Sequence, residues 1–346
     1  MKGTILKTAQ IIFTVAVVSI IAGCNGTVGE KKSAKCDKQF LTVDFQQGQT
    51  LRYKFVSNRD IDVQWGPEKG KSKAGRGKVD KSNEYMEMVV AYQPIQVVPY
   101  GLTTIKATCE SVKARRSSSR ARGRQKDAVE TLEGKSFTFT VGPTGRIEDY
   151  SQLDKLIHEV GERAFRSRGK TGRAGRVKEP DMISDFIASQ WFLWDSVSSI
   201  EKAADGVCVG RTWKSKLSVP NTMVLRKARN VNYTLAEVRR TEKGRLAVIH
   251  SSYSPAKSVP SDWPPMPYSG TFQLSGPFGF LRMFGRGFNV RDLQGQGEEL
   301  FNIDAGRTEQ YNQNYQMQLE AASGSILGVK PRITIKQNLT MQLLED

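Results

Sequence analysis

The feature that most constrains this chain is a pair of sequence matches at one spacing. Residues 48–55 (GQTLRYKF) resemble residues 210–217 (GRTWKSKL), and residues 145–150 (GRIEDY) resemble residues 306–311 (GRTEQY). The partners are 162 residues apart in the first pair and 161 in the second. Two matches at nearly the same spacing indicate an internal duplication. In each match a Gly leads into a strand-like or turn-like segment, so the matches carry structural information only.

Apolar and polar residues alternate through both duplicated segments, with the period of two that is typical of β-strands. Leu51, Tyr53 and Phe55 share one predicted face, and residues 57–60 (SNRD) are typical of a turn before the next strand. Further strands are predicted around Met86, Met88, Val90, Tyr92, Ile105, Ala107, Cys109, Phe137, Phe139, Val141, Val231, Tyr233, Leu235, Tyr311, Tyr315, Met317, Leu319, Ile333, Ile335, Leu339, Met341 and Leu343. We therefore expect two related antiparallel β-lobes, at residues 40–150 and 207–346.

Residues 151–206 have helical spacing and interrupt the alternation. This segment predicts two helices that pack on the sheet, so the fold class is mainly β with a helical insert (α+β). The second helix has a very broad apolar face that includes Phe186, Trp191 and Trp194. Such a face is normally buried against a sheet. The alternative is that these three side chains line a pocket for an apolar ligand.

The N-terminus has the features of an export signal. Residues 1–7 form a short basic segment, residues 11–21 are apolar, and small residues precede Cys24. The apolar run is too short for a bilayer-spanning helix, which needs about 20 residues. Residues 21–24 (IAGC) resemble the lipobox of bacterial lipoproteins. This resemblance implies that residues 1–23 are a signal peptide and that Cys24 carries acyl chains such as palmitate.

The lipobox resemblance also implies a location and a tether. Two or three acyl chains give stable attachment to a membrane, whereas one chain is marginal. We therefore expect an anchored protein of the cell envelope, facing the periplasm or the exterior, with residues 24–39 as a lipidated tether. Asn25 in place of Asp favours the outer membrane in a host with two membranes, by resemblance to lipoproteins of such bacteria.

The formal net charge of +17 is concentrated in three segments. Residues 66–81 carry six Lys or Arg and two acidic residues. Residues 113–126 and 163–178 each carry seven Lys or Arg and no acidic residue. These segments are rich in Gly, Ser and Ala and lack apolar periodicity, which predicts mobile loops.

The basic segments predict either solvated loops with no ligand or contact with anionic envelope material. Arg115, Arg116, Arg120, Arg122 and Arg124 are the candidate contact residues. Nucleic acid is not an expected partner, because the segments contain no interleaved aromatic residues to stack bases and an exported protein rarely meets nucleic acid.

Three cysteines remain after Cys24. Cys36, Cys109 and Cys208 predict one disulfide and one buried thiol in an oxidising compartment, but the sequence does not identify the pair.

The chain lacks the sequence signatures of common catalytic sites. His158 and His250 are the only histidines, and neither stands at metal-ligand spacing from another His or Cys. No nucleophile elbow is present, and residues 66–72 (GPEKGKS) are one residue short of a P-loop. We expect no enzyme activity, no cofactor and no metal.

The order of these motifs resembles a family of uncharacterised two-lobed bacterial lipoproteins. The resemblance rests on the lipobox, residues 48–55, residues 144–148 (TGRIE), the helical pair and residues 209–213 (VGRTW). It covers most of residues 40–346 and implies a fold and a location. The family has no established activity to carry over, and the three basic segments have no counterpart in its pattern.

Two hypotheses about function remain. The first is a non-enzymatic envelope protein whose β-lobes and basic loops contact anionic surface components or other proteins. The second is a carrier or chaperone for an apolar ligand such as a lipid, held between the sheet and the helices. The second arrangement resembles envelope lipoproteins that hold acyl chains between a curved sheet and covering helices.

Overall fold

The computed structural model describes residues 36–67, 78–99, 101–118, 127–166, 176–177, 182–219, 227–258, 273–274, 288–321 and 329–345. The chain divides into two compact units, Met1–Lys35 and Cys36–Asp346. All described residues belong to the second unit, so the predicted export signal and Cys24 lie outside them. Within these ranges, no helix has the length and apolar character needed to cross a membrane.

Long strands dominate the second unit, as the alternation predicts. They are β1 (Leu51–Pro67), β2 (Lys78–Val97), β3 (Thr103–Ser118), β4 (Ser136–Val141), β5 (Ile147–Asp149), β6 (Arg176–Val177), β7 (Thr212–Val219), β8 (Lys227–Thr241), β9 (Gly244–Pro255), β10 (Gln273–Leu274), β11 (Phe288–Asn302), β12 (Arg307–Ala321) and β13 (Val329–Leu344). The helical elements are η1 (Ala128–Leu132), α1 (Ser151–Arg166), α2 (Ile183–Phe192), α3 (Asp195–Ser198) and η2 (Ala203–Asp205).

Eleven of the strands form one open antiparallel sheet, in the order β5-β4-β3-β2-β1-β13-β12-β11-β9-β8-β7. The prediction of a mainly antiparallel β fold is therefore confirmed. β13 pairs with β1 along almost the whole of β1, from Arg52 to Pro67. Apart from this pairing, each strand of the sheet lies beside its neighbour in the chain, because β6 and β10 pair separately with each other.

The sheet is continuous across the residues where two lobes were expected. β1 to β5 form one half and β7 to β13 form the other. Gly48 and Gly210 precede β1 and β7, and Gly145 and Gly306 precede β5 and β12. β1 and β12 are inner strands of the sheet, whereas β5 and β7 are its two edge strands. All four glycines have positive φ, at 86°, 85°, 89° and 58°. This backbone conformation disfavours other residues, which explains why Gly recurs at these points.

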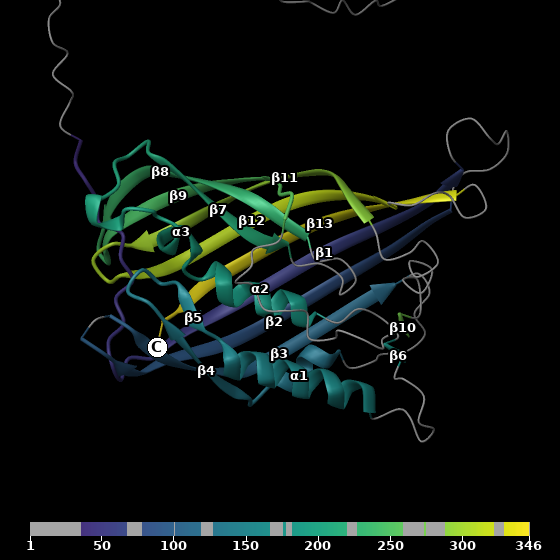
Figure 1. Ribbon diagram of the computed structural model, residues 1–346, viewed down its shortest axis with the longest axis horizontal. Helices are drawn as coiled ribbons and strands as arrows, with labels where there is room; N and C mark the ends of the chain where they lie inside the picture. Colours follow the sequence, from purple (N-terminus) through teal and green to yellow (C-terminus); the bar gives the residue numbers. More distant parts are fainter. Residues whose placement is uncertain are drawn as a thin grey trace, which may run out of the picture. The chain divides into compact units, whose positions relative to one another are not determined.

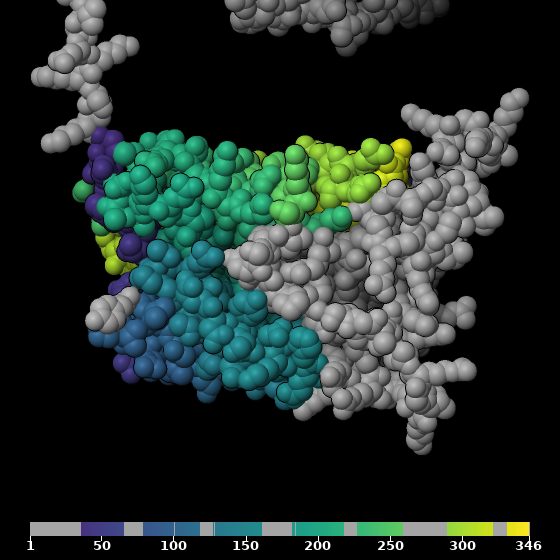
Figure 2. Space-filling view, in the orientation of Figure 1, coloured from purple at the N-terminus to yellow at the C-terminus, as the bar shows by residue number. Residues whose placement is uncertain are grey.

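The helices lie on one face of the sheet, and the sheet curves around them (Figure 1). α2 reaches the first half of the sheet, where Phe186 meets Phe137 of β4 with ring centroids 5.9 Å apart. The following α3 reaches the opposite edge, where the Trp213 indole of β7 donates a hydrogen bond to the Ser196 carbonyl at 2.7 Å. A short helical segment can contact both edges only because the sheet bends. Figure 2 shows the blue-teal first half and the green β7–β9 region adjoining on this face.

β1 is one continuous strand, contrary to the turn predicted at residues 57–60. Ser57 and Arg59 continue the inward face of Leu51, Tyr53 and Phe55, with exposed fractions of 3% and 1%. The sequence misleads here because its inward side chains change from apolar to polar while the backbone stays extended. The reason is a set of buried polar partners, described below.

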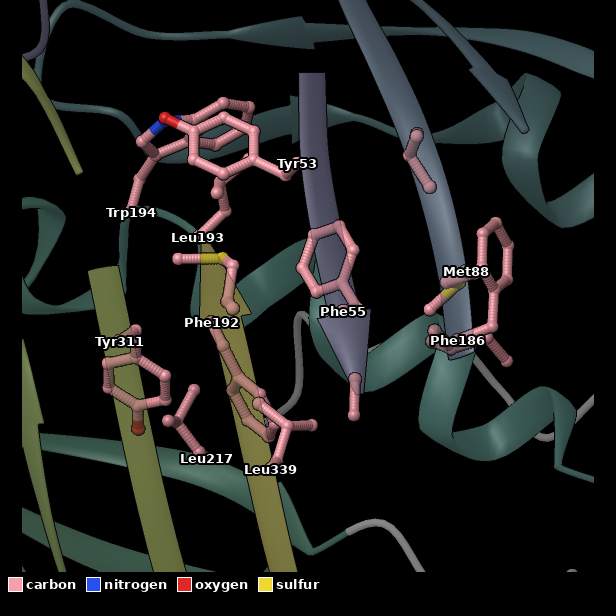
Figure 3. Close-up of a cluster of buried hydrophobic side chains, with 14 of the residues drawn as sticks. Tyr53, Phe55, Met88, Phe186, Phe192, Leu193, Trp194, Leu217, Tyr311 and Leu339 are labelled. Atoms are coloured by element: carbon pink, nitrogen blue, oxygen red, sulfur yellow. The ribbon is translucent and has the colours of Figure 1, made fainter. Parts of the chain in front are cut away.

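An aromatic core fills the space between α2–α3 and the sheet. Trp194 lies at its centre, 5.4 Å from Phe45, 6.0 Å from Tyr92 and 5.8 Å from Phe139 by ring centroids. Figure 3 shows this core drawing side chains from β1, β2, β12, β13 and the helical segment. Full burial of a large apolar side chain stabilises a fold by about 1.5–3 kcal/mol, so this core holds the helices in place.

The segment before β1 is tied to the ends of several strands. Gln39 forms a two-way backbone bridge with Val207, and the Asp44 amide donates to the Gly306 carbonyl at 2.9 Å. A Cβ at Gly306 would lie 2.5 Å from the Asp44 amide nitrogen, so this close approach requires Gly. Residues 36–39, which the sequence assigned to a free tether, are thus part of the folded unit.

The disulfide joins Cys36 to Cys208, with a Cα–Cα distance of 5.9 Å. Cys109 is a buried free thiol on β3. The prediction of one bridge and one buried thiol is confirmed. Burial raises the pKa of the Cys109 thiol to about 12, so this group stays protonated.

The basic segments are only partly described. Residues 113–118 lie in β3, contrary to the predicted loop. Residues 68–77, 119–126 and 167–175 lie outside the described residues.

Candidate functional site

A row of polar side chains crosses the concave face of the sheet. The cross-strand register places Arg116 opposite Glu84, Glu84 opposite Arg59, and Arg59 opposite Gln337. Beyond Gln337 the row continues through Tyr315, Gly295 and Tyr253. We call these seven residues the polar belt. A Cβ on Gly295 would lie 2.5 Å from the Cβ of Tyr315, so the absence of a side chain there leaves room for the tyrosine.

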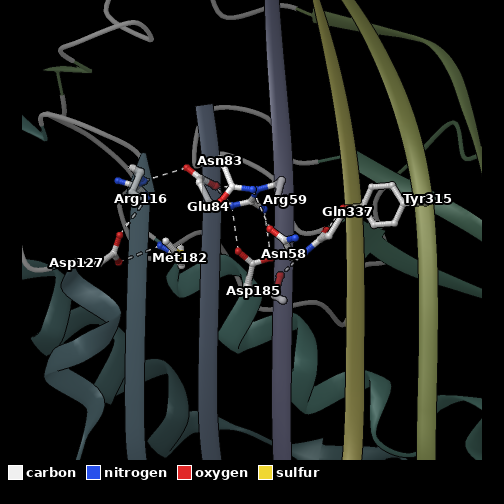
Figure 4. A network of polar contacts seen from close by, with 11 residues as sticks. Asn58, Arg59, Asn83, Glu84, Arg116, Asp127, Met182, Asp185, Tyr315 and Gln337 are labelled. Atoms are coloured by element: carbon white, nitrogen blue, oxygen red, sulfur yellow. Dashed lines mark hydrogen bonds and ion pairs between the residues drawn. The ribbon is translucent and has the colours of Figure 1, made fainter. Parts of the chain in front are cut away.

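Arg59 lies at the centre of the belt and bonds two carboxylates (Figure 4). Its Nε donates to Glu84 Oε2 at 2.8 Å, and its Nη2 lies 3.0 Å from Asp185 Oδ2. Asp185 belongs to the first turn of α2, so this contact joins the helix to the sheet. All three side chains are almost fully buried. Charge-assisted hydrogen bonds are stronger than neutral ones, so they hold the start of α2 firmly against β1 and β2.

Gln337 of β13 extends the contact between the helix and the sheet. Its Nε2 donates to Asp185 Oδ1 at 2.7 Å and to Ser57 Oγ at 2.8 Å, and its Oε1 accepts from the Tyr315 hydroxyl. An amide is well suited to this position because it donates and accepts at once. Strands from both halves of the sheet therefore hold the start of α2.

Arg116 pairs with Glu84 and Asp127 at 3.1 Å each. Asp127 also accepts from the Val129 and Met182 backbone amides, at 3.1 Å each. It thereby caps η1 and binds the residue that precedes α2. Arg116, predicted to contact an anionic surface, instead points into the belt with a side chain only 15% exposed.

The belt and its helical partners contain three carboxyl groups for two guanidinium groups. Burial raises the pKa of Glu84, but the charges of Arg59 and Arg116 outweigh it and leave the pKa below its ordinary value. Burial raises the pKa values of Asp127 and Asp185, and their cation partners offset this only in part. The aspartates are thus the groups in this network that take up a proton most easily.

A third buried guanidinium, Arg229 on β8, lies beyond the end of the belt. Its Cζ is 4.1 Å from the ring centroid of Tyr253, 5.0 Å from that of Phe192 and 5.5 Å from that of Tyr315. Its Nη2 donates to Gln313 Oε1 at 2.6 Å. Its Nε and Nη1 are buried and have no hydrogen-bond partner. Cation–π contacts stabilise a desolvated guanidinium, but they leave these donors unpaired.

Glu299 of β11 is a buried acid with an unusual proton affinity. Burial is the main cause that raises the pKa of its carboxyl to about 7. The Thr308 hydroxyl lies 2.7 Å from Glu299 Oε1 and 3.0 Å from the Leu193 carbonyl oxygen. One hydroxyl hydrogen cannot fully satisfy two acceptors. A proton on Glu299 resolves this, because the acid then donates to Thr308 and Thr308 donates to Leu193.

A shallow depression of about 800 Å³ lies at the end of the sheet, where β1, β12 and β13 meet the surface. Its lining includes Arg307 and Lys243, which pair with Glu309 and Glu345. Because these charges already have partners, the depression is a weaker candidate site than the concave face.

The three aromatic residues predicted to line a ligand pocket lie in or beside the core. Phe186 and Trp194 are buried in the aromatic contacts already described. Trp191 is partly buried, with its ring centroid 5.4 Å from that of Tyr150. Their assignment as ligand lining stays a prediction.

The structure places the predicted basic contacts apart. Arg115 is exposed on β3, whereas Arg116 points into the belt. Arg120, Arg122 and Arg124 lie outside the described residues. In the described ranges, no group of three His, Cys, Asp or Glu side chains is arranged to hold a metal ion.

The sequence did not identify Arg59, Arg229 or Glu299 as special. Each occupies an inward position of an alternating strand and has an apolar residue two positions away on one side. A charged residue at a position where the alternation predicts an inward, apolar side chain is the signal that could have identified them.

No protein-family model matches this chain, and no curated protein matches it. Among solved structures, the chain is similar to lipovitellin, in a structure described by its lipid–protein interactions. The sequence identity is 10% and the TM-score is 0.39, with 87% of this chain and 26% of the lipovitellin chain covered. The chain thus spans about a quarter of the length of that protein.

Proposed function

We propose that this protein is a non-enzymatic carrier for an apolar ligand, tethered to a membrane of the cell envelope through Cys24. One observation carries the proposal. The concave face of the sheet continues past the polar belt as a buried apolar surface, whereas α2 and α3 pack against the aromatic core on the other side of the belt.

This surface consists of two rows of side chains on the central strands. The first row contains Ile61, Ile335 and Met317, which lie opposite one another on β1, β13 and β12. The second row contains Val63, Ile333 and Leu319 on the same strands. We call these six residues the apolar wall. All of them have exposed fractions of 3% or less, so the apolar wall is an interior surface of the protein and not an open groove.

The described helices end at the belt, on one side of the apolar wall. Asp185, in the first turn of α2, contacts Arg59 and Gln337 of the belt. From there α2 and α3 run away from the wall, toward the aromatic core (Figure 1). The belt therefore separates the part of the interior that α2 and α3 fill from the apolar wall, whose six residues all come from strands.

An open sheet of eleven strands can enclose more volume than its own side chains fill. In closed barrels, about eight strands already leave an interior that side chains just fill or that holds one small ligand. An acyl chain laid on the apolar wall would gain about 0.8 kcal/mol for each buried CH₂ group. This is the physical basis for expecting a lipid-like ligand.

The proposed location rests on the sequence. The lipobox-like residues 21–24 support lipidation of Cys24, and the Cys36–Cys208 disulfide is compatible with an oxidising compartment. Contact of Arg115 and the other basic residues of this segment with anionic envelope material belongs to the same proposal, as a second mode of binding at the membrane surface.

We also propose that the two halves of the sheet arose by duplication. The repeated motifs precede strands in both halves of the sheet, and their leading glycines share a positive φ. On this view residues 40–150 and 207–346 are related units, and residues 151–206 were added between them to cover the concave face.

The first experiment is ligand binding to the full chain with Cys24→Ala, which removes the proposed anchor. Native mass spectrometry should show a bound mass of lipid size, and methyl oleate should change the tryptophan fluorescence saturably. Met317→Gln should weaken methyl oleate binding, because it places an amide in the apolar wall. The absence of both a lipid-size mass and saturable binding would refute the proposal.

Met88→Gln is the matched control. Met88 is as buried as Met317, with an exposed fraction of 0%, but it lies in the filled part of the interior, on the other side of the belt. Both substitutions should lower the stability to a similar extent. Equal loss of binding in the two variants would show that the effect is on folding and that the wall is not the binding surface.

A further inference from the structure

The unpaired donors of Arg229 require an explanation. The side chain has an exposed fraction of 0%, and its Nε and Nη1 have no hydrogen-bond partner. Buried polar groups in native proteins are almost always paired with protein, water or an ion. A buried guanidinium without a counter-ion is strongly unfavourable. An apolar residue here should make the ligand-free chain more stable, so a role in binding a ligand would account for the arginine.

The surrounding residues do not provide a counter-ion. No carboxylate of the described residues forms an ion pair with Arg229. Burial raises the pKa values of the Tyr311 and Tyr315 hydroxyls above the ordinary range, so neither ring becomes a phenolate at neutral pH. Gln313 is neutral and occupies only one of the guanidinium nitrogens.

The position of Arg229 relates it to the apolar wall. Tyr253 of the belt lies opposite Val231, and Arg229 lies two residues from Val231, opposite Pro255. On β1 and β12, the residues two positions from the belt in the same direction are Ile61 and Met317. Arg229 therefore lies in the first row of the wall, toward the β7 edge of the sheet. Lys227, two residues from Arg229 toward the start of β8, lies on the same face of the sheet.

We infer that Arg229 binds the anionic head group of the ligand, so that the ligand is an amphiphile with one carboxylate or phosphate group and an apolar tail. This inference rests on the proposed function, because the tail requires the apolar wall. The free Nε and Nη1 would donate to the head group, and Tyr253 and Phe192 would hold the guanidinium plane. The tail would extend along the rows toward Ile335 and Ile61.

The test compares three probes on the full chain with Cys24→Ala. Oleate has the head and the tail, methyl oleate has the tail without the charge, and inorganic phosphate has an anion without a tail. Oleate should bind more tightly than methyl oleate. Arg229→Gln should weaken oleate binding about 10- to 100-fold, which is the range expected for losing charge-assisted hydrogen bonds. The same substitution should leave methyl oleate binding unchanged.

The outcomes separate the two proposals. Equal binding of oleate and methyl oleate, unchanged in Arg229→Gln, would overturn the role of Arg229 and leave the apolar carrier intact. Binding of phosphate that is lost in Arg229→Gln, without binding of either oleate or its ester, would support an anion site and refute the carrier. No binding of any probe would overturn both.

Two further variants protect the test against misfolding. Arg239→Gln removes an exposed arginine of the same strand and should bind all probes like the parent chain. Arg229→Met replaces the buried cation with an apolar side chain of similar length. It should raise the urea midpoint of the ligand-free protein while oleate binding is lost, since it removes an uncompensated charge. A lower midpoint together with retained oleate binding would show that Arg229 serves the fold alone.

Discussion

Glu299 gives the most direct test of the electrostatics of the interior. The raised pKa of about 7, against an ordinary value of 4.5, means that the folded chain keeps a proton that the unfolded chain releases. The stability associated with this proton is complete below pH 4.5 and is lost as the pH rises to about 7. The two pKa values correspond to a loss of about 3 kcal/mol in the free energy of unfolding.

Glu299→Gln should remove this loss. Glutamine is close in size to the protonated acid, and its amide can donate to the Thr308 hydroxyl while Thr308 donates to the Leu193 carbonyl. We expect the free energies of unfolding of the two proteins to be similar at pH 4.5. At pH 8 the variant should be more stable by about 3 kcal/mol, because only the parent chain must bury a carboxylate.

The assay is urea denaturation of both proteins at pH 4.5, 6, 7 and 8. Other groups titrate equally in the two proteins, so the difference between them isolates Glu299. Glu237→Gln, which changes an exposed glutamate, is the control and should follow the parent chain at every pH. A difference between Glu299→Gln and the parent chain that stays constant from pH 4.5 to pH 8 would refute the reasoning.

Three other predictions concern stability and reactivity. Arg59→Met should lower the free energy of unfolding by about 3–5 kcal/mol, since it leaves the buried carboxyl groups of Glu84 and Asp185 without their shared cation; a loss under about 1 kcal/mol in urea would contradict this. Cys36→Ser should destabilise the chain by about 2–4 kcal/mol, because the bridge to Cys208 spans 172 residues; an unchanged melting temperature would argue against it. The buried Cys109 thiol should react with a maleimide only after unfolding, and rapid labelling of the native protein by mass spectrometry would disagree with its burial and raised pKa.

The alternation of apolar and polar residues was enough to predict a mainly antiparallel β fold and the inward faces of strands such as β1 and β13, but it identified no residues of β11. It was correct for segments such as Tyr53–Phe55, where every inward side chain is apolar and buried. It failed at Ser57 and Arg59, since inward polar residues look like a turn when their partners are unknown. Those partners, Glu84, Asp185 and Gln337, come from three distant segments of the chain.

The assembly of two halves into one sheet was not visible in the sequence. Strands do follow Gly48 and Gly210, as the repeat predicts, but a repeat is compatible with two separate lobes or with one sheet. Whether one sheet or two lobes form depends on the pairing between β1 and β13, and no local sequence pattern predicts that pairing. The candidate site was missed for the same reason, because Arg229 becomes unusual only when its neighbours on β9 and β12 are known.

The pairing of β1 with β13 has a consequence for the order in which the chain is made. β1 begins at Leu51 and its partner ends at Leu344, so the first strand synthesised receives its second neighbour from the last one. Until then β1 has a long row of unpaired backbone donors and acceptors, which is the edge that draws other chains into aggregates. Synthesis that stops before β13 therefore leaves a chain with an open edge at its centre. Proteolysis or chaperones would have to remove or shield such chains, and the loss of residues from β13 would affect the middle of the sheet.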